Sequence, residues 1–207
     1  LNKASSNAQD GISAIQTAEG ALNEAHSILQ RMNELATQSA NDTNTTADRT
    51  AVQSEVNALT NELSRIASTS QFNTQNLLDG TFTGKNLQVG ALENQKITIS
   101  IGTMNAKALG VDSLNVKSFT KAGSAMTLIQ KAISKVSGQR SDLGALQNRL
   151  EHTVNNLDNI SENTQTAESR IRDTDMASEM VQYSATSIIQ QAGQSMLAQA
   201  NSQTQGV

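Results

Sequence analysis

The chain has 207 residues, a formal net charge of -4, and neither Pro, Cys nor Trp. Hydrophobic residues make up 36% of it but aromatic residues only 2%, so we expect a thin aliphatic core, unlike the aromatic-rich core of most enzymes of this length. The absence of Cys excludes disulfides and thiolate sites, the weak negative charge offers nothing to nucleic acid or anionic lipid, and no apolar run reaches the roughly 20 residues of a membrane span.

Residues 1–70 predict two long antiparallel helices. Two interleaved series of apolar residues recur every seven positions, which is typical of a coiled-coil seam: Ile15, Leu22, Leu29 and Ala36, with Ala18, Ala25 and Met32. The polar run at 41–44 interrupts the pattern and indicates a turn, because its side chains compete for backbone hydrogen bonds. A second stripe with alternating spacings of four and three follows: Val52, Val56, Leu59, Leu63 and Ile66. The two seams are expected to cover each other.

Residues 71–121 have a different pattern. Asp79-Gly80 and Thr83-Gly84 indicate turns, and further on Ile97, Ile99 and Ile101 alternate with polar residues. This alternation predicts a β-hairpin or a small sheet. A short stretch at 106–109 is compatible with one helical turn.

Residues 122–175 predict a third, very long helix. Its stripe is kept by Met126, Leu128, Ile129, Ile133, Val136, Leu143, Leu146, Leu150, Val154, Leu157 and Ile160. About 50 helical residues extend roughly 75 Å and cannot bury themselves, so the first two helices should lie along this one. Residues 176–207 are only weakly amphipathic and predict a partial terminal helix that is marginal alone. The expected fold is mainly α, a long antiparallel helical bundle or coiled-coil rod with a small β-hairpin region.

One stretch of the third helix, residues 143–152, has an unusual composition. Glycine inside a helix costs about 1 kcal/mol relative to Ala, so Gly144 suggests that a neighbouring backbone comes close; an accidental surface glycine is the alternative. Gln147, Asn148 and Arg149 cannot all enter an apolar core, so some must face a partner or water. We expect these four residues to form a packing face.

The chain carries no recognisable catalytic constellation. His26 and His152 lie in different predicted helices without metal-ligand spacing. No glycine-rich phosphate loop and no Gly-x-Ser-x-Gly elbow is found. The sequence therefore predicts a protein that is not an enzyme and needs no cofactor or metal.

Several stretches are specific enough to indicate a family. LGALQNRLEHTVNNL (143–157), AESRIRDTDMASEM (167–180) and SMLAQANSQ (195–203) closely resemble the carboxy-terminal helical region of bacterial flagellin. Residues 5–42 and QFNTQNLLDG (71–80) resemble its amino-terminal counterpart. Compared with the family pattern, the chain begins past the usual amino-terminal helix and stops before the apolar tail, so we expect a core fragment.

The resemblance implies a secreted structural subunit of the flagellar filament that self-assembles for motility. Its implied partners are other flagellin subunits and an export chaperone of the flagellar system, with neither nucleic acid nor membrane among them. A coiled-coil adhesin or a secretion-system tip protein is the alternative interpretation.

A polar ridge on the first helix suggests a binding surface. Arg31, Glu34 and Gln38 follow helical spacing, and a solvated helix face is the simplest interpretation. The resemblance implies more, because flagellins detected by vertebrate Toll-like receptor 5 carry matching residues at Arg31, Leu35, Gln38 and Glu55. The expected receptor-binding set is Gln30, Arg31, Leu35, Gln38, Val52 and Glu55.

Two further expectations concern this ridge. Asn33 stands where many of those flagellins have a second Arg, which implies weaker binding. If the first and third helices pack side by side, Arg31, Glu55 and Arg149 could share one exposed polar strip, which filament assembly would hide.

Overall fold

The computed structural model describes the backbone of residues 1–204 and the side chains of residues 1–172 and 176–201. The chain divides into two compact units, Leu1–Asp158 and a second that begins at Asn159. The elements in chain order are α1 (Asn2–Ser39), α2 (Thr46–Thr69), β1 (Gln71–Phe72), β2 (Gln75–Asn76), β3 (Lys85–Gln88), β4 (Lys96–Ile99), α3 (Ala106–Leu109) and α4 (Phe119–Thr204). The expected fold class, mainly α with a small β region, is confirmed.

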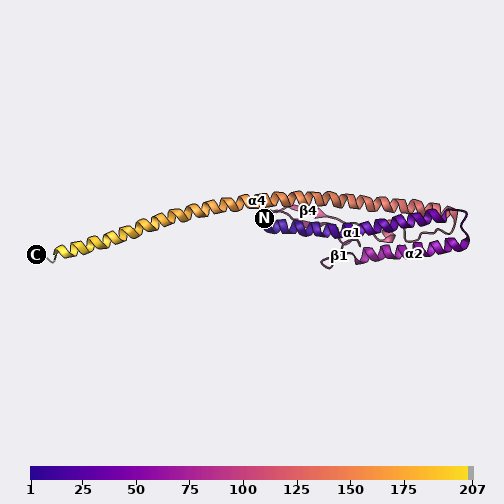
Figure 1. Ribbon diagram of the computed structural model, residues 1–207, viewed down its shortest axis with the longest axis horizontal. Helices are drawn as coiled ribbons and strands as arrows, with labels where there is room; N and C mark the ends of the chain where they lie inside the picture. The colour runs from indigo at the N-terminus through magenta and orange to yellow at the C-terminus, as the bar shows by residue number, and fades with distance from the viewer. Residues whose placement is uncertain (205–207) are drawn as a thin grey trace. The chain divides into compact units, whose positions relative to one another are not determined.

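The predicted break between the first two helices is confirmed. α1 ends at Ser39 and α2 begins at Thr46, and a capping box fixes the second start: the Thr45 hydroxyl accepts from the Asp48 N–H, while the Asp48 carboxylate accepts from the Thr45 N–H. This reciprocal pair satisfies two backbone donors that the helix would otherwise leave without partners. α1 and α2 then pack side by side through their apolar seams (Figure 1).

The middle of the chain contains two separate hairpins rather than one sheet. β3 pairs antiparallel with β4, which confirms the β-hairpin that the alternation predicts, and Leu87 lies opposite Ile97. β1 pairs with β2 through a two-residue turn in which Asn73 and Thr74 both have positive φ. Such a turn matches the twist of the strands. The expected helical turn is α3, which Asn105 caps at its start.

The part of α4 that belongs to the first unit packs antiparallel to α1. Near one end the Thr37 hydroxyl lies 3.2 Å from the Met126 sulfur, and near the other the Ser5 hydroxyl donates to Asp158 at 2.9 Å. The buried stripe of this helix part is Ala122, Ala125, Ile129, Ala132, Val136, Leu143, Leu150 and Leu157. Small and aliphatic residues alone therefore allow the two helices to approach closely, as the composition predicts.

The segment after β4 closes the bundle between α2 and α4. The buried Gln53 side chain of α2 donates to the Leu114 carbonyl at 2.9 Å and accepts from the Val116 N–H at 2.8 Å. On the other side, the Lys135 ammonium of α4 donates to the Ala108 carbonyl at 2.9 Å. Gln53 thus supplies hydrogen-bond partners for the Leu114 carbonyl and the Val116 N–H, which are not paired within a β-sheet. The order around the first unit is α1, α2, this segment, α4.

The second unit is a helical stretch of α4 with little burial of its own. Its large apolar side chains are all exposed among those described, including Ile171, Val181, Ile188 and Leu197. None of the helices in the described part of the chain is long and apolar enough to span a membrane.

Candidate partner-binding surface

Arg31 is the centre of a charged cluster that joins α1 to α2. Its Nη2 and Nε donate to Glu55 Oε1 at 2.9 and 3.1 Å, and its Nη1 donates to Glu34 Oε2 at 3.2 Å. These hydrogen bonds, first of all the one with Glu55, raise the pKa of the Arg31 guanidinium. The side chains of Arg31 and Glu55 are 52% and 45% exposed. The cluster is therefore held in one geometry yet accessible to a partner.

The other predicted receptor residues divide into exposed and buried ones. Gln30 and Gln38 are exposed on α1, and the Gln30 side chain lies 3.1 Å from the ring of His26. Leu35 and Val52, at 1% and 8% exposed, belong to the core. Their predicted direct contact with a receptor does not fit this structure, because both side chains point into the apolar core that α1 and α2 share.

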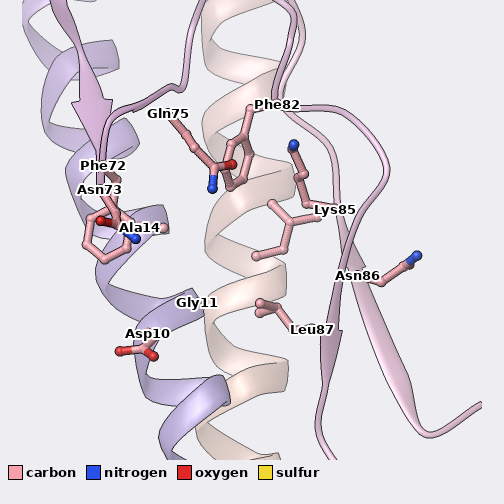
Figure 2. Close-up of a pocket in the computed structure, with 11 residues that line it drawn as sticks. Asp10, Gly11, Ala14, Phe72, Asn73, Gln75, Phe82, Lys85, Asn86 and Leu87 are labelled. Carbon is pink, nitrogen blue, oxygen red and sulfur yellow. The ribbon is translucent and has the colours of Figure 1, made fainter. Parts of the chain in front are cut away.

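Gly144 does not mark a close backbone approach within the subunit, so that prediction is wrong for the single chain. A Cβ added at Gly144 would meet no atom within 4 Å outside its own helix backbone. The close approach is at Gly11 of α1, where a Cβ would lie 2.1 Å from Leu87 Cδ1 and 3.4 Å from Leu150 Cδ1. The hairpin side chain Leu87 therefore uses the space that Gly11 leaves on the helix surface (Figure 2).

The polar residues that follow Gly144 do face outward. Gln147 is half-buried and donates to Glu151 at 2.9 Å, while Asn148 and Arg149 are exposed. Because Leu150 packs against Gly11, Arg149 lies at the Gly11 level of α1, about 30 Å of helix away from Arg31 at 1.5 Å per residue. The predicted polar strip that would combine Arg31 and Glu55 with Arg149 is therefore wrong, because these residues lie in two separate regions of the first unit.

The β1–β2 turn is a feature that sequence reasoning missed, and it borders a cavity of about 250 Å³. Phe72 and Phe82, two of the three phenylalanines, line it together with the Gly11 stretch of α1 (Figure 2). The Lys85 ammonium lies 5.8 Å from the centre of the Phe82 ring, within range of a cation–π contact. The cavity marks the place where both hairpins meet α1. Asn73-Thr74, which lies between Gln71-Phe72 and the polar pair Gln75-Asn76, was the available signal in the sequence.

The charged side chains of this surface are available for polar contacts. Within the described part of the chain, no group of three or more His, Asp or Glu side chains could hold a metal ion. The exposed charges sit on helix surfaces, where they can form hydrogen bonds and ion pairs with another macromolecule.

Comparison with known proteins identifies the family. Residues 1–83 match the bacterial flagellin N-terminal helical region, and residues 126–207 match the bacterial flagellin C-terminal helical region. A flagellin of Halalkalibacterium halodurans is 53% identical over 209 residues, covering 100% of this chain and 77% of that protein. The flagellar filament 33 kDa core protein of Treponema phagedenis is 48% identical over 223 residues, covering 100% and 78%.

Solved structures agree. The crystal structure of Bacillus cereus flagellin superposes with a TM-score of 0.64 at 33% identity, covering 73% of this chain and 88% of that one. Both halves of the helical core, their order and their spacing therefore match the same family. The chain belongs to the bacterial flagellin family and is a structural subunit of the flagellar filament.

Proposed function

We propose that the free subunit is recognised by vertebrate Toll-like receptor 5 through the Arg31 face, which comprises Gln30, Arg31, Gln38 and Glu55. The observation that carries this proposal is the Arg31–Glu55 ion pair of 2.9 Å, which crosses from α1 to α2 with both side chains about half exposed.

The pair gives Arg31 an advantage as a binding residue. A flexible arginine loses conformational entropy when a partner fixes it, whereas Glu55 and Glu34 already hold this guanidinium in place. Arginine is frequent among the residues that dominate interface energies. Leu35 and Val52 take a different role in the proposal: their burial fixes the distance between α1 and α2, and with it the position of the pair.

The proposal also covers export and packing. The subunit is secreted through the flagellar export system with a chaperone as transient partner, which the exposed apolar residues of the second unit support. The exposed Asn148 and Arg149, with the half-buried Gln147 beside them, contribute to packing between subunits, since they present hydrogen-bonding groups on one stretch of α4.

Receptor recognition is tested with Arg31→Ala and Glu55→Ala on reporter cells that carry the receptor. We expect each variant to lose about tenfold or more in potency, which corresponds to about 1.4 kcal/mol, with an unchanged melting temperature. Arg65→Ala is the matched control, because Arg65 forms a comparable exposed ion pair with Glu62 on α2. Full potency of both Arg31→Ala and Glu55→Ala would show that the Arg31 face is a plain solvated surface.

A further inference from the structure

The lysines of this chain are concentrated on one part of the first unit. Five of the eight lie between residues 107 and 135, and all five are exposed: Lys107, Lys117, Lys121, Lys131 and Lys135. The ion pairs found in the described part of the chain all use arginine, and no lysine there has a carboxylate within 4.0 Å. Their charge is therefore not neutralised by close pairing within the subunit.

Three of these lysines lie along one face of α4. Lys121, Lys131 and Lys135 fall within about 80° of the helix circumference, at 100° per residue. Leu128, which is 41% exposed, lies within the same arc. We call these three lysines the lysine strip.

The lysine strip points away from α1. Met126, which the Thr37 hydroxyl of α1 contacts, is nine residues before Lys135 and so lies on the opposite side of α4. The Lys135 ammonium bonds instead to the Ala108 carbonyl, in the segment between α2 and α4. Lys135 and Asp142 line the same surface hollow, so the Asp142 carboxylate partly offsets the charge of Lys135. Most of the positive charge of the lysine strip that no nearby carboxylate offsets is therefore on Lys121 and Lys131.

The opposite charge runs along α2. Asp48, Glu55 and Glu62 are seven residues apart and therefore share one edge of the helix, which we call the carboxylate strip. Glu55 is bridged to α1 by Arg31. Gln53, two residues before Glu55 and on the far side of α2, faces the segment that contains Leu114. The carboxylate strip thus faces the outer α1–α2 side, away from the segment that borders the lysine strip.

The two strips match in length as well as in sign. Lys121 to Lys135 and Asp48 to Glu62 each span fourteen residues, or about 21 Å of helix. Arg31 and Arg65 reduce the negative charge of the second strip, but Glu24 and Glu34 on the adjoining edge of α1 add to it. The α1–α2 side therefore stays acidic and the lysine strip stays basic.

We propose that the lysine strip of one subunit binds the carboxylate strip of the neighbouring subunit in the filament. This rests on the filament-subunit function and is independent of receptor recognition. A contact of each strip with its own copy would set like charges against each other, which is unfavourable. A contact between the lysine strip of one subunit and the carboxylate strip of the next joins two different surfaces, so it is heterologous. A heterologous contact can repeat from copy to copy and generate an open polymer. Leu128 adds an apolar side chain at the centre of the contact.

The test is charge reversal during seeded elongation. Folded subunits are added to fragments of wild-type filament, and the critical concentration is measured by sedimentation. We expect Lys121→Glu/Lys131→Glu to raise it at least tenfold, and Glu55→Lys/Glu62→Lys to do the same. A chain that carries all four substitutions should elongate from seeds of its own kind close to the wild-type critical concentration, because the reversed strips complement each other again.

The matched control is Lys3→Glu/Lys96→Glu, which makes the same charge change at two exposed lysines outside the strip. It should elongate like wild type, and circular dichroism confirms that each variant is folded. Normal elongation of Lys121→Glu/Lys131→Glu, an equal defect in the control, or failure of the fourfold chain to recover would each overturn the proposal. Failure of the wild-type subunit to elongate would instead contradict the filament function on which it rests.

Discussion

Leu150→Ala is the sharpest probe of how the first unit is held together. Leu150 is fully buried, and its Cδ1 lies 3.4 Å from the position of a Cβ at Gly11. Truncating a buried leucine costs about 2 to 5 kcal/mol, and more where the surroundings cannot collapse into the cavity. Gly11 has no side chain that could fill it. We therefore expect about 3 to 5 kcal/mol, a large part of the 5 to 15 kcal/mol that stabilises a typical domain.

The assay is a thermal melt followed by circular dichroism, and only the cooperative transition is compared. For a unit of this size, 1 kcal/mol shifts the melting temperature by about 2 to 4 °C, so a loss on the order of 10 °C is expected. Leu128→Ala is the control, because it makes the same change on the same helix at a side chain that is 41% exposed. A melt of Leu150→Ala within 2 °C of wild type, or an equal loss in Leu128→Ala, would refute the packing of α4 described above.

Two substitutions and one proteolysis experiment test local features. Gly144→Ala should raise the free energy of unfolding by up to about 1 kcal/mol, since the site is open and Ala is the better helix former; a lower melting temperature would contradict the open surroundings of Gly144. Hydrogen bonds from Thr45 lower the pKa of Asp48 in the folded chain. The Asp48 carboxylate therefore stabilises the fold at pH values above its pKa in the unfolded chain, which is near 4, and this stabilisation is lost as the pH falls through the pKa of the folded chain. The melting difference between wild type and Asp48→Asn should therefore shrink as the pH falls below about 4, and a constant difference would argue against the capping carboxylate. Trypsin should cut at Arg170 and Arg172 in the second unit before any site in the first, as a time course read by mass spectrometry would show; equal protection of both units would contradict this.

The helical architecture could be predicted from the sequence because its signal is periodic. A seven-residue repeat specifies a helix and a buried seam at once, and Leu22, Leu29 and Val56 are fully buried as the repeat requires. The turn at 41–44 was visible for a similarly local reason, since its polar side chains favour non-helical hydrogen bonds.

The long-range contacts could not be predicted in the same way. Gly11 and Gly144 look alike in sequence, and only the path of the β3–β4 hairpin decides which of them lies under another side chain. Likewise the spacing places Leu35 on α1 without showing that it points into the core rather than toward a partner. The sequence shows that Lys121 and Lys131 are charged, but it does not show where these lysines lie relative to α2, because that depends on the order of the elements around the bundle.

The distribution of apolar surface suggests why the two units of α4 differ. In the first unit the stripe of this helix is covered by α1, and Leu143 and Leu150 are fully buried. In the second, Ile171, Val181 and Ile188 are about two-thirds exposed, so helix propensity alone must hold a segment that propensity stabilises only marginally. A filament subunit can use this difference, because a segment that buries its apolar residues only against other subunits gains most of its stability on assembly. We therefore expect the first unit, which carries the Arg31 face and the lysine strip, to be the part that keeps its fold as a monomer.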